Sequence, residues 1–118
     1  MVKNFANVFK AVSEPSRIRI LKMLQVRPLC VCEIADVLGL TNSTVSEHLS
    51  VLRENNLVSF DKKGKIVFYR LNFYPDDPSV TAINSIITCS LENDSLIRSD
   101  RRKAKIVDCR VILARDKK

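Results

Sequence analysis

The chain has 118 residues, enough for one compact domain with a modest core and too few for two. Hydrophobic residues make up 46% of it and only two residues are glycine, which favours a globular and mainly helical protein. No apolar run is long enough to span a membrane, and the first residues lack the apolar segment of a signal peptide. We therefore expect a cytoplasmic protein with no membrane partner. Its four cysteines are expected to be reduced thiols: Cys30, Cys32, Cys89 and Cys109.

The net charge of +7 is distributed unevenly along the chain. Residues 1–97 hold 11 Lys and Arg against 10 Asp and Glu, whereas residues 98–118 hold nine against three. We expect residues 1–97 to form the folded domain and residues 98–118 to form a basic tail that includes Cys109. Such tails are usually solvated, so the net charge by itself supports nucleic-acid binding only weakly.

Apolar spacing predicts three helices in the first 40 residues. One apolar stripe over residues 5–12 indicates a short first helix. Pro15 suits the start of a second helix that runs to about Gln25. A third apolar face over residues 31–38 ends at Gly39, which is typical of the residue just after a helix.

The next predicted helix has one apolar and one polar face. Thr41 is a good N-cap, and the apolar face follows at helical spacing with Val45, Leu49 and Leu52. The opposite face offers short polar side chains that suit base edges in a groove: Asn42, Ser43, Ser46, Glu47 and Ser50. Two helices joined by a short turn with a glycine form a helix-turn-helix, whose second helix enters the major groove. We therefore predict that this polar face reads DNA.

A β-hairpin is predicted after this helix. Residues 58–62 and 65–71 are β-type runs around a basic tip with Lys62, Lys63 and Lys65. Lysines at a tip can protect an edge strand, but beside a helix-turn-helix we favour contacts with the phosphate backbone. These lysines and Arg53 should then supply salt-sensitive affinity for DNA.

A final helix should begin at Asp77 and Pro78, and its apolar side is a candidate dimer contact.

Cys30 and Cys32 form a thiol pair that suits a soft, thiophilic ion. We expect no His or carboxylate partner beside them, which disfavours a catalytic zinc site. On an ideal helix, positions i and i+2 lie about 200° apart, so the two sulfurs should flank the apolar stripe on opposite sides. Binding should therefore distort the first turn of the third helix and shift the helix that follows.

Three stretches of the sequence point together to one family. They are SEPSR from Ser13, LCVCEIADVLGLTNSTVSEHLSVLRENNLV from Leu29, and KKGKIVFYRL from Lys62. Together they resemble the ArsR/SmtB family of winged helix-turn-helix metalloregulatory repressors, over about residues 4–97. The resemblance implies five core helices with a β-wing, a homodimer formed by the first and last helices, and a palindromic double-stranded DNA operator. It also implies that inducer binding lowers DNA affinity and releases transcription.

Within that family, CVC at the start of the third helix is typical of arsenic and antimony sensors and of some cadmium and lead sensors. The commonest arsenic pattern has a third cysteine where this chain has Ala35. The third ligand is therefore predicted to be Cys109, where nearby Arg and Lys favour a thiolate, with Cys89 as the alternative. If neither joins, a two-thiol site would suit a mono-organic trivalent arsenic.

The predicted function is a repressor that leaves its operator when As(III) or Sb(III) binds cysteine thiolates. Two alternatives are a cadmium- or lead-responsive repressor of the same family, and a redox-responsive repressor whose cysteines form a disulfide. A disulfide between cysteines one residue apart would be strained, which weighs against the second alternative. An enzyme is disfavoured, because the single histidine, His48, is expected to pack or to touch a phosphate, and no nucleophile with a base can be assembled.

Overall fold

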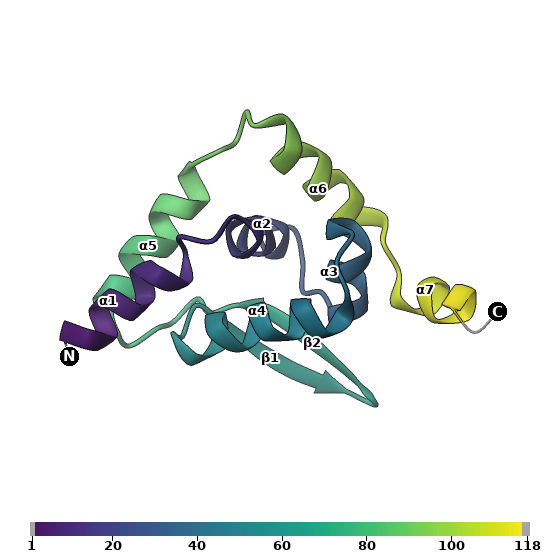
Figure 1. Cartoon of the computed structure of the whole chain (residues 1–118), viewed down its shortest axis with the longest axis horizontal. Coiled ribbons are helices and arrows are strands. Elements are labelled where there is room, and N and C mark those ends of the chain that lie inside the picture. The colour runs from purple at the N-terminus through teal and green to yellow at the C-terminus, as the bar shows by residue number, and fades with distance from the viewer. Residues whose placement is uncertain (1, 117–118) are drawn as a thin grey trace.

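The computed structural model describes residues 2–116, which fold into seven helices and one β-hairpin. In chain order these are α1 (Val2–Ala11), α2 (Pro15–Leu24), α3 (Val31–Leu38), α4 (Asn42–Glu54), β1 (Val58–Lys63), β2 (Ile66–Leu71), α5 (Pro78–Cys89), α6 (Ser95–Ile106) and α7 (Cys109–Asp116). Figure 1 shows α2 at the centre, with α5 and α6 as two arms over it, α3 to its right, and α4 and the hairpin below. Within residues 2–116, no helix is long and apolar enough to cross a membrane.

The predicted starts of α2, α4 and α5 and the predicted end of α3 are confirmed, because each follows from local backbone chemistry, whereas α1 begins three residues before the predicted stripe. Pro15 begins α2, and Gly39 ends α3 with a φ of 70°, a left-handed conformation that glycine adopts without strain. Thr41 caps α4 by accepting a hydrogen bond from the backbone N–H of Thr44 at 3.2 Å. Asp77 caps α5 in the same way.

The core is centred on α2 and the buried faces of the helices around it. Ile20 and Leu21 of α2 have no exposed surface, and neither have Val45 and Leu49 of α4. Helix α2 packs on α4, α5, α6 and β2. The polar face of α4 is thereby turned outward, as predicted.

The hairpin pairs β1 with β2 antiparallel, from Val58 opposite Leu71 to Lys63 opposite Ile66. Its turn contains Gly64, whose φ is 64°. The strands end within one residue of the predicted bounds. The backbone at Leu29, just before α3, pairs with Tyr69 of β2 and so joins the hairpin to the helices.

Over residues 98–116 the structure differs from the predicted solvated basic tail. Most of it forms α6 and α7, and α6 packs on α2 and α3. Ile97, Asp100 and Ala104 are buried on one side of α6, and Asp100 pairs with Arg19 of α2. Because this buried stripe contains an aspartate and an alanine among many charges, its spacing gave no apolar signal. Residues 117–118 of the predicted tail lie outside the described residues.

Candidate thiol site and DNA-binding surface

Cys30 and Cys32 lie in contact, with 3.2 Å between their Sγ atoms. Cys30 is the N-cap of α3, with an extended backbone at φ −91° and ψ 169°, and the helix begins only at Val31. The prediction that the sulfurs flank opposite sides of a helix is therefore wrong, because Cys30 precedes the helix. The two thiols can meet one ion without any unwinding of α3.

A carboxylate lies beside these thiols, contrary to prediction. Glu33 Oε1 accepts a hydrogen bond from the backbone N–H of Cys30 at 2.9 Å, and Glu33 is only 3% exposed. A glutamate three residues after an N-cap commonly folds back in this way, so the spacing of Cys30 and Glu33 was the sequence signal for it.

Cys109 is the described cysteine that joins the pair from elsewhere in the chain. It begins α7 and is 6% exposed, and its sulfur, the Cys30 sulfur and a Glu33 oxygen all lie within 4.8 Å of one another. Cys89 instead ends α5, where it is exposed, and α5 packs on α1 and α2. The structure thus brings Cys109, and not Cys89, to the CVC motif, while ligation itself stays a prediction.

Burial controls the protonation of Cys30 and Cys32. It raises the pKa of Cys30 well above the ordinary value of 9.0, although a backbone hydrogen bond from Glu33 partly opposes the shift. Burial also raises the pKa of Cys32, and the charge of Cys109 adds to that shift. Cys30 and Cys32 are therefore protonated at neutral pH before anything binds.

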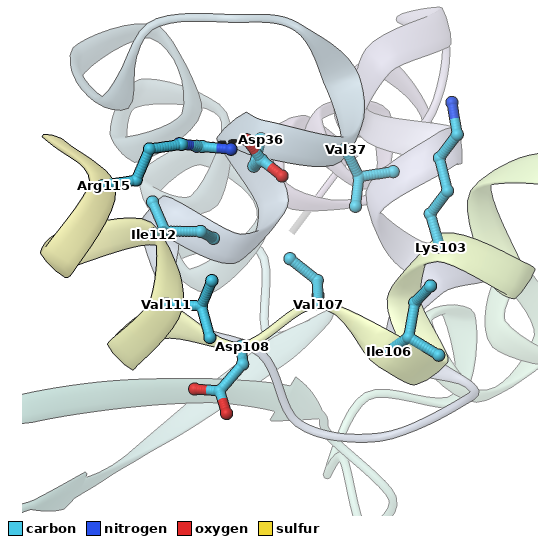
Figure 2. A pocket seen from close by; sticks show the side chains of 9 residues that line it. All are labelled: Asp36, Val37, Lys103, Ile106, Val107, Asp108, Val111, Ile112 and Arg115. Atoms are coloured by element: carbon cyan, nitrogen blue, oxygen red, sulfur yellow. Dashed lines mark hydrogen bonds and ion pairs between the residues drawn. The ribbon is translucent and has the colours of Figure 1, made fainter.

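Helix α7 packs on α3, and its contacts include an apolar side chain and an ion pair. Ile112 is 5% exposed, and an Arg115 Nη2 to Asp36 Oδ1 contact of 2.8 Å joins the two helices. Asp36, Val37 and Ile112 line a groove of about 370 Å³ together with the end of α6, and Figure 2 shows these side chains. A second hollow lies between α7 and the turn of the helix-turn-helix, so α7 lies next to the start of α4.

The predicted DNA-reading residues share one exposed surface. Asn42, Ser43, Ser46, Glu47, Ser50 and Arg53 are all exposed on α4, and Lys62, Lys63 and Lys65 are exposed at the hairpin tip. The Arg53 guanidinium lies 4.2 Å from the centre of the Phe60 ring on β1, which ties the helix to the hairpin. Contact of these residues with DNA stays a prediction.

His48 lies on the flank of α4, with 17% of its side chain exposed and its Nδ1 atom 3.9 Å from Glu14 Oε2. Its half-buried position favours the packing role over a phosphate contact.

The fold and this surface define the class of the protein. A polar helix exposed after a tight glycine turn, beside a hairpin with a basic tip, is a winged helix-turn-helix. The solved homodimeric winged helix-turn-helix domain Mb0332 from Mycobacterium bovis, described as a possible ArsR-family regulator, superposes with a TM-score of 0.62 and 25% identity, over 74% of this chain and 77% of that one.

Sequence comparison gives the family. The family described as "Bacterial regulatory protein, arsR family" matches residues 14–59. An arsenical resistance operon repressor of Staphylococcus aureus is 31% identical over 86 residues, 73% of this chain and 83% of that protein. A homologue of the cadmium resistance regulator CadC, also from Staphylococcus aureus, is 37% identical over 68 residues. That match spans 57% of this chain and just over half, 56%, of the relative. This chain belongs to the arsR family, whose members are transcriptional regulators and not enzymes.

Proposed function

We propose that this protein is a repressor that releases operator DNA when trivalent arsenic or antimony binds Cys30, Cys32 and Cys109. The observation that carries the proposal is the contact of 3.2 Å between the first two sulfurs, with the buried Cys109 sulfur within 4.8 Å of the Cys30 sulfur. Soft thiolate sets of this kind select thiophilic ions. The similarity to an arsenical resistance operon repressor supports the same inducer.

The charge of the filled site favours a trivalent metalloid over a divalent cation. Arsenous acid, As(OH)₃, reacts with three thiols to form three As–S bonds and three waters, so the product is neutral and no proton is released. A cadmium or lead ion bound by three thiolates keeps a net negative charge, next to the Glu33 carboxylate. Burying an uncompensated charge is costly, and Cys30 and Cys109 are almost fully buried. A cadmium response is the second candidate, because one relative is a homologue of a cadmium regulator.

The thiols are connected to the DNA-binding surface on two sides. Leu29, next to Cys30, is hydrogen-bonded to the hairpin strand β2, and α3 leads through the turn at Gly39 into α4. Helix α7, which begins with Cys109, faces that same turn across a small hollow. An inducer shifts such a structure only if it binds one arrangement more tightly. We propose that capture of all three thiols holds α3, α7 and the hairpin in an arrangement that fits DNA poorly.

The first and fifth helices are the proposed dimer surface. Helices α1 and α5 pack side by side (Figure 1), and Phe5, Phe9 and Ile86 on them are exposed by 52%, 47% and 62%. The Phe5 and Phe9 rings lie 4.9 Å apart, and exposed apolar groups of this size favour a contact with another molecule. A two-fold dimer presents two reading helices, so its operator should be palindromic.

The test is operator release by arsenite, followed by fluorescence anisotropy. Cys30→Ser and Cys32→Ser should abolish release, and Cys109→Ser should raise the arsenite needed by about tenfold or more, because one As–S bond is lost. Cys89→Ser, a matched change of an exposed cysteine, should behave as the wild type. Release from a Cys30→Ser, Cys32→Ser double variant would overturn the proposal. Release by peroxide, with no response to arsenite, would support the redox alternative instead.

A further inference from the structure

Arg27 lies in the loop between α2 and α3, and its guanidinium reaches the end of α6. Its Nε atom donates to the carbonyl of Ala104 at 3.0 Å, and its Nη2 atom donates to the carbonyl of Val107. Ala104 is in the last turn of α6 and Val107 is its C-cap, where backbone carbonyls lack partners within the helix. Arg27 thus satisfies these carbonyls and holds the short linker that leads to Cys109.

The same guanidinium also holds the first thiol. Arg27 Nη2 donates to Glu33 Oε2 at 3.1 Å, while the other Glu33 oxygen accepts the backbone N–H of Cys30 at 2.9 Å. One side chain therefore connects the backbone at Cys30 with the backbone two residues before Cys109. Arg27 Nη1 is held in turn by the carbonyl of Pro28 at 3.0 Å.

Helix α7 depends on contacts of this kind to keep its position. It has eight residues, and helices this short have little stability of their own in water. Its ion pair between Arg115 and Asp36 is exposed, with side-chain exposures of 58% and 37%, and exposed pairs contribute little. Figure 2 shows Val107 and Asp108 as the bridge between α6 and α7. Asp108 of that bridge accepts a hydrogen bond from the backbone N–H of Arg110 within α7 at 2.8 Å, whereas Arg27 joins the bridge to the loop before α3.

We propose that Arg27 is a positioning residue that holds Cys109 over the Cys30–Cys32 pair and so completes the three-thiol site. The inference rests on the proposed function, because it concerns how the same site is assembled. Lysine cannot replace arginine here: its single ammonium group cannot reach three carbonyls and a carboxylate in the fixed directions of a guanidinium. Arg27→Lys therefore removes the positioning while keeping the charge.

The first measurement is alkylation of each cysteine, read by mass spectrometry on the full-length protein without metalloid. Arg27→Lys should raise the alkylation rate of Cys109 by about tenfold, as expected when one or two hydrogen bonds that bury it are removed. Arg27→Lys should still unfold in one cooperative urea transition, which shows that the core remains folded. Arg102→Lys, at an exposed position of α6, is the matched control and should not change the Cys109 rate. An unchanged Cys109 rate in Arg27→Lys would overturn the inference.

The second measurement adds arsenite. In the wild type, arsenite should protect Cys30, Cys32 and Cys109 and leave Cys89 reactive, whereas in Arg27→Lys it should leave Cys109 reactive as well. The arsenite needed for operator release should rise about tenfold in Arg27→Lys but no further when Cys109→Ser is already present. A further rise in that background would show that Arg27 acts elsewhere and would overturn the inference. If the wild type shows no protection of Cys30 and Cys32, the proposed function fails, and the inference fails with it.

Discussion

Leu29 and Tyr69 exchange two backbone hydrogen bonds: Leu29 N–H donates to Tyr69 O at 3.0 Å, and Tyr69 N–H donates to Leu29 O at 2.8 Å. Leu29 immediately precedes the first thiol, and Tyr69 belongs to strand β2 of the hairpin. The thiol site and the wing thus share a direct backbone connection. A change at Cys30 can reach the hairpin without passing through α4.

Arsenite should therefore slow amide hydrogen exchange at Leu29 and Tyr69. This holds if the motion that opens the Leu29–Tyr69 pair also opens the thiol site. Arsenite at about 100 times its Kd then adds about 2.7 kcal/mol to the free energy of opening, and exchange becomes roughly 100-fold slower. The Lys62–Val67 pair near the hairpin tip is the internal control and should not change. Equal slowing at the tip would point to a general stabilisation and not to this connection.

Alkylation of Cys30 and Cys32 should depend steeply on pH. The reactive species is the thiolate, and burial raises the pKa of both thiols above 9.0, so the rates should rise about tenfold per pH unit from pH 7 to 9 without levelling. The protein in denaturant, read by the same mass spectrometry, should react faster and level off near pH 9. The same shifts favour unfolding above pH 9, because the unfolded chain then releases protons that the folded thiols retain. A plateau below pH 9 in the native protein would contradict this prediction.

The two parts of the proposed DNA surface should respond differently to mutation. Lys62→Ala or Lys63→Ala should weaken binding to all DNA sequences alike. Each should also reduce the slope of log K against log salt by about 0.9 for each phosphate that the protein no longer neutralises. Ser46→Ala and Glu47→Ala should instead change the preferred sequence with little effect on that slope. Competition binding with operator variants at two salt concentrations separates the cases. Equal weakening of every sequence by Ser46→Ala and Glu47→Ala would remove them from base reading.

Asp100→Asn should destabilise the whole domain. Asp100 accepts hydrogen bonds of 2.8 and 2.9 Å from Arg19, and its side chain is only 2% exposed. Removing one member of a buried pair costs about 3 kcal/mol, which urea unfolding would detect. Asp61→Asn breaks the exposed pair with Arg70 and should cost less than about 1 kcal/mol. Similar effects of both variants on the free energy of unfolding would mean that α6 is not part of the cooperative unit.

The sequence by itself determined the helix-turn-helix and the hairpin. Gly39, Thr41 and Asp77 act on their own neighbouring backbone, so their effects can be predicted from local order. The buried residues Val45, Leu49 and Leu52 alternate with polar residues because one side of α4 packs on the core. Such signals need no knowledge of distant residues.

Only the tertiary structure decided the conformation of residues 98–116 and the surroundings of the thiols. Asp100 becomes a core residue because Arg19, 81 positions earlier, neutralises it there. Cys109 meets Cys30 because α6 crosses α2 and α3 before the chain turns into α7. Cys30 and Cys32 were evident as a pair, but their contact depends on where α3 begins, and their third neighbour depends on packing between segments far apart in the chain. Spacing along a sequence specifies faces of single elements, whereas a buried site made from several elements is specified by how they pack.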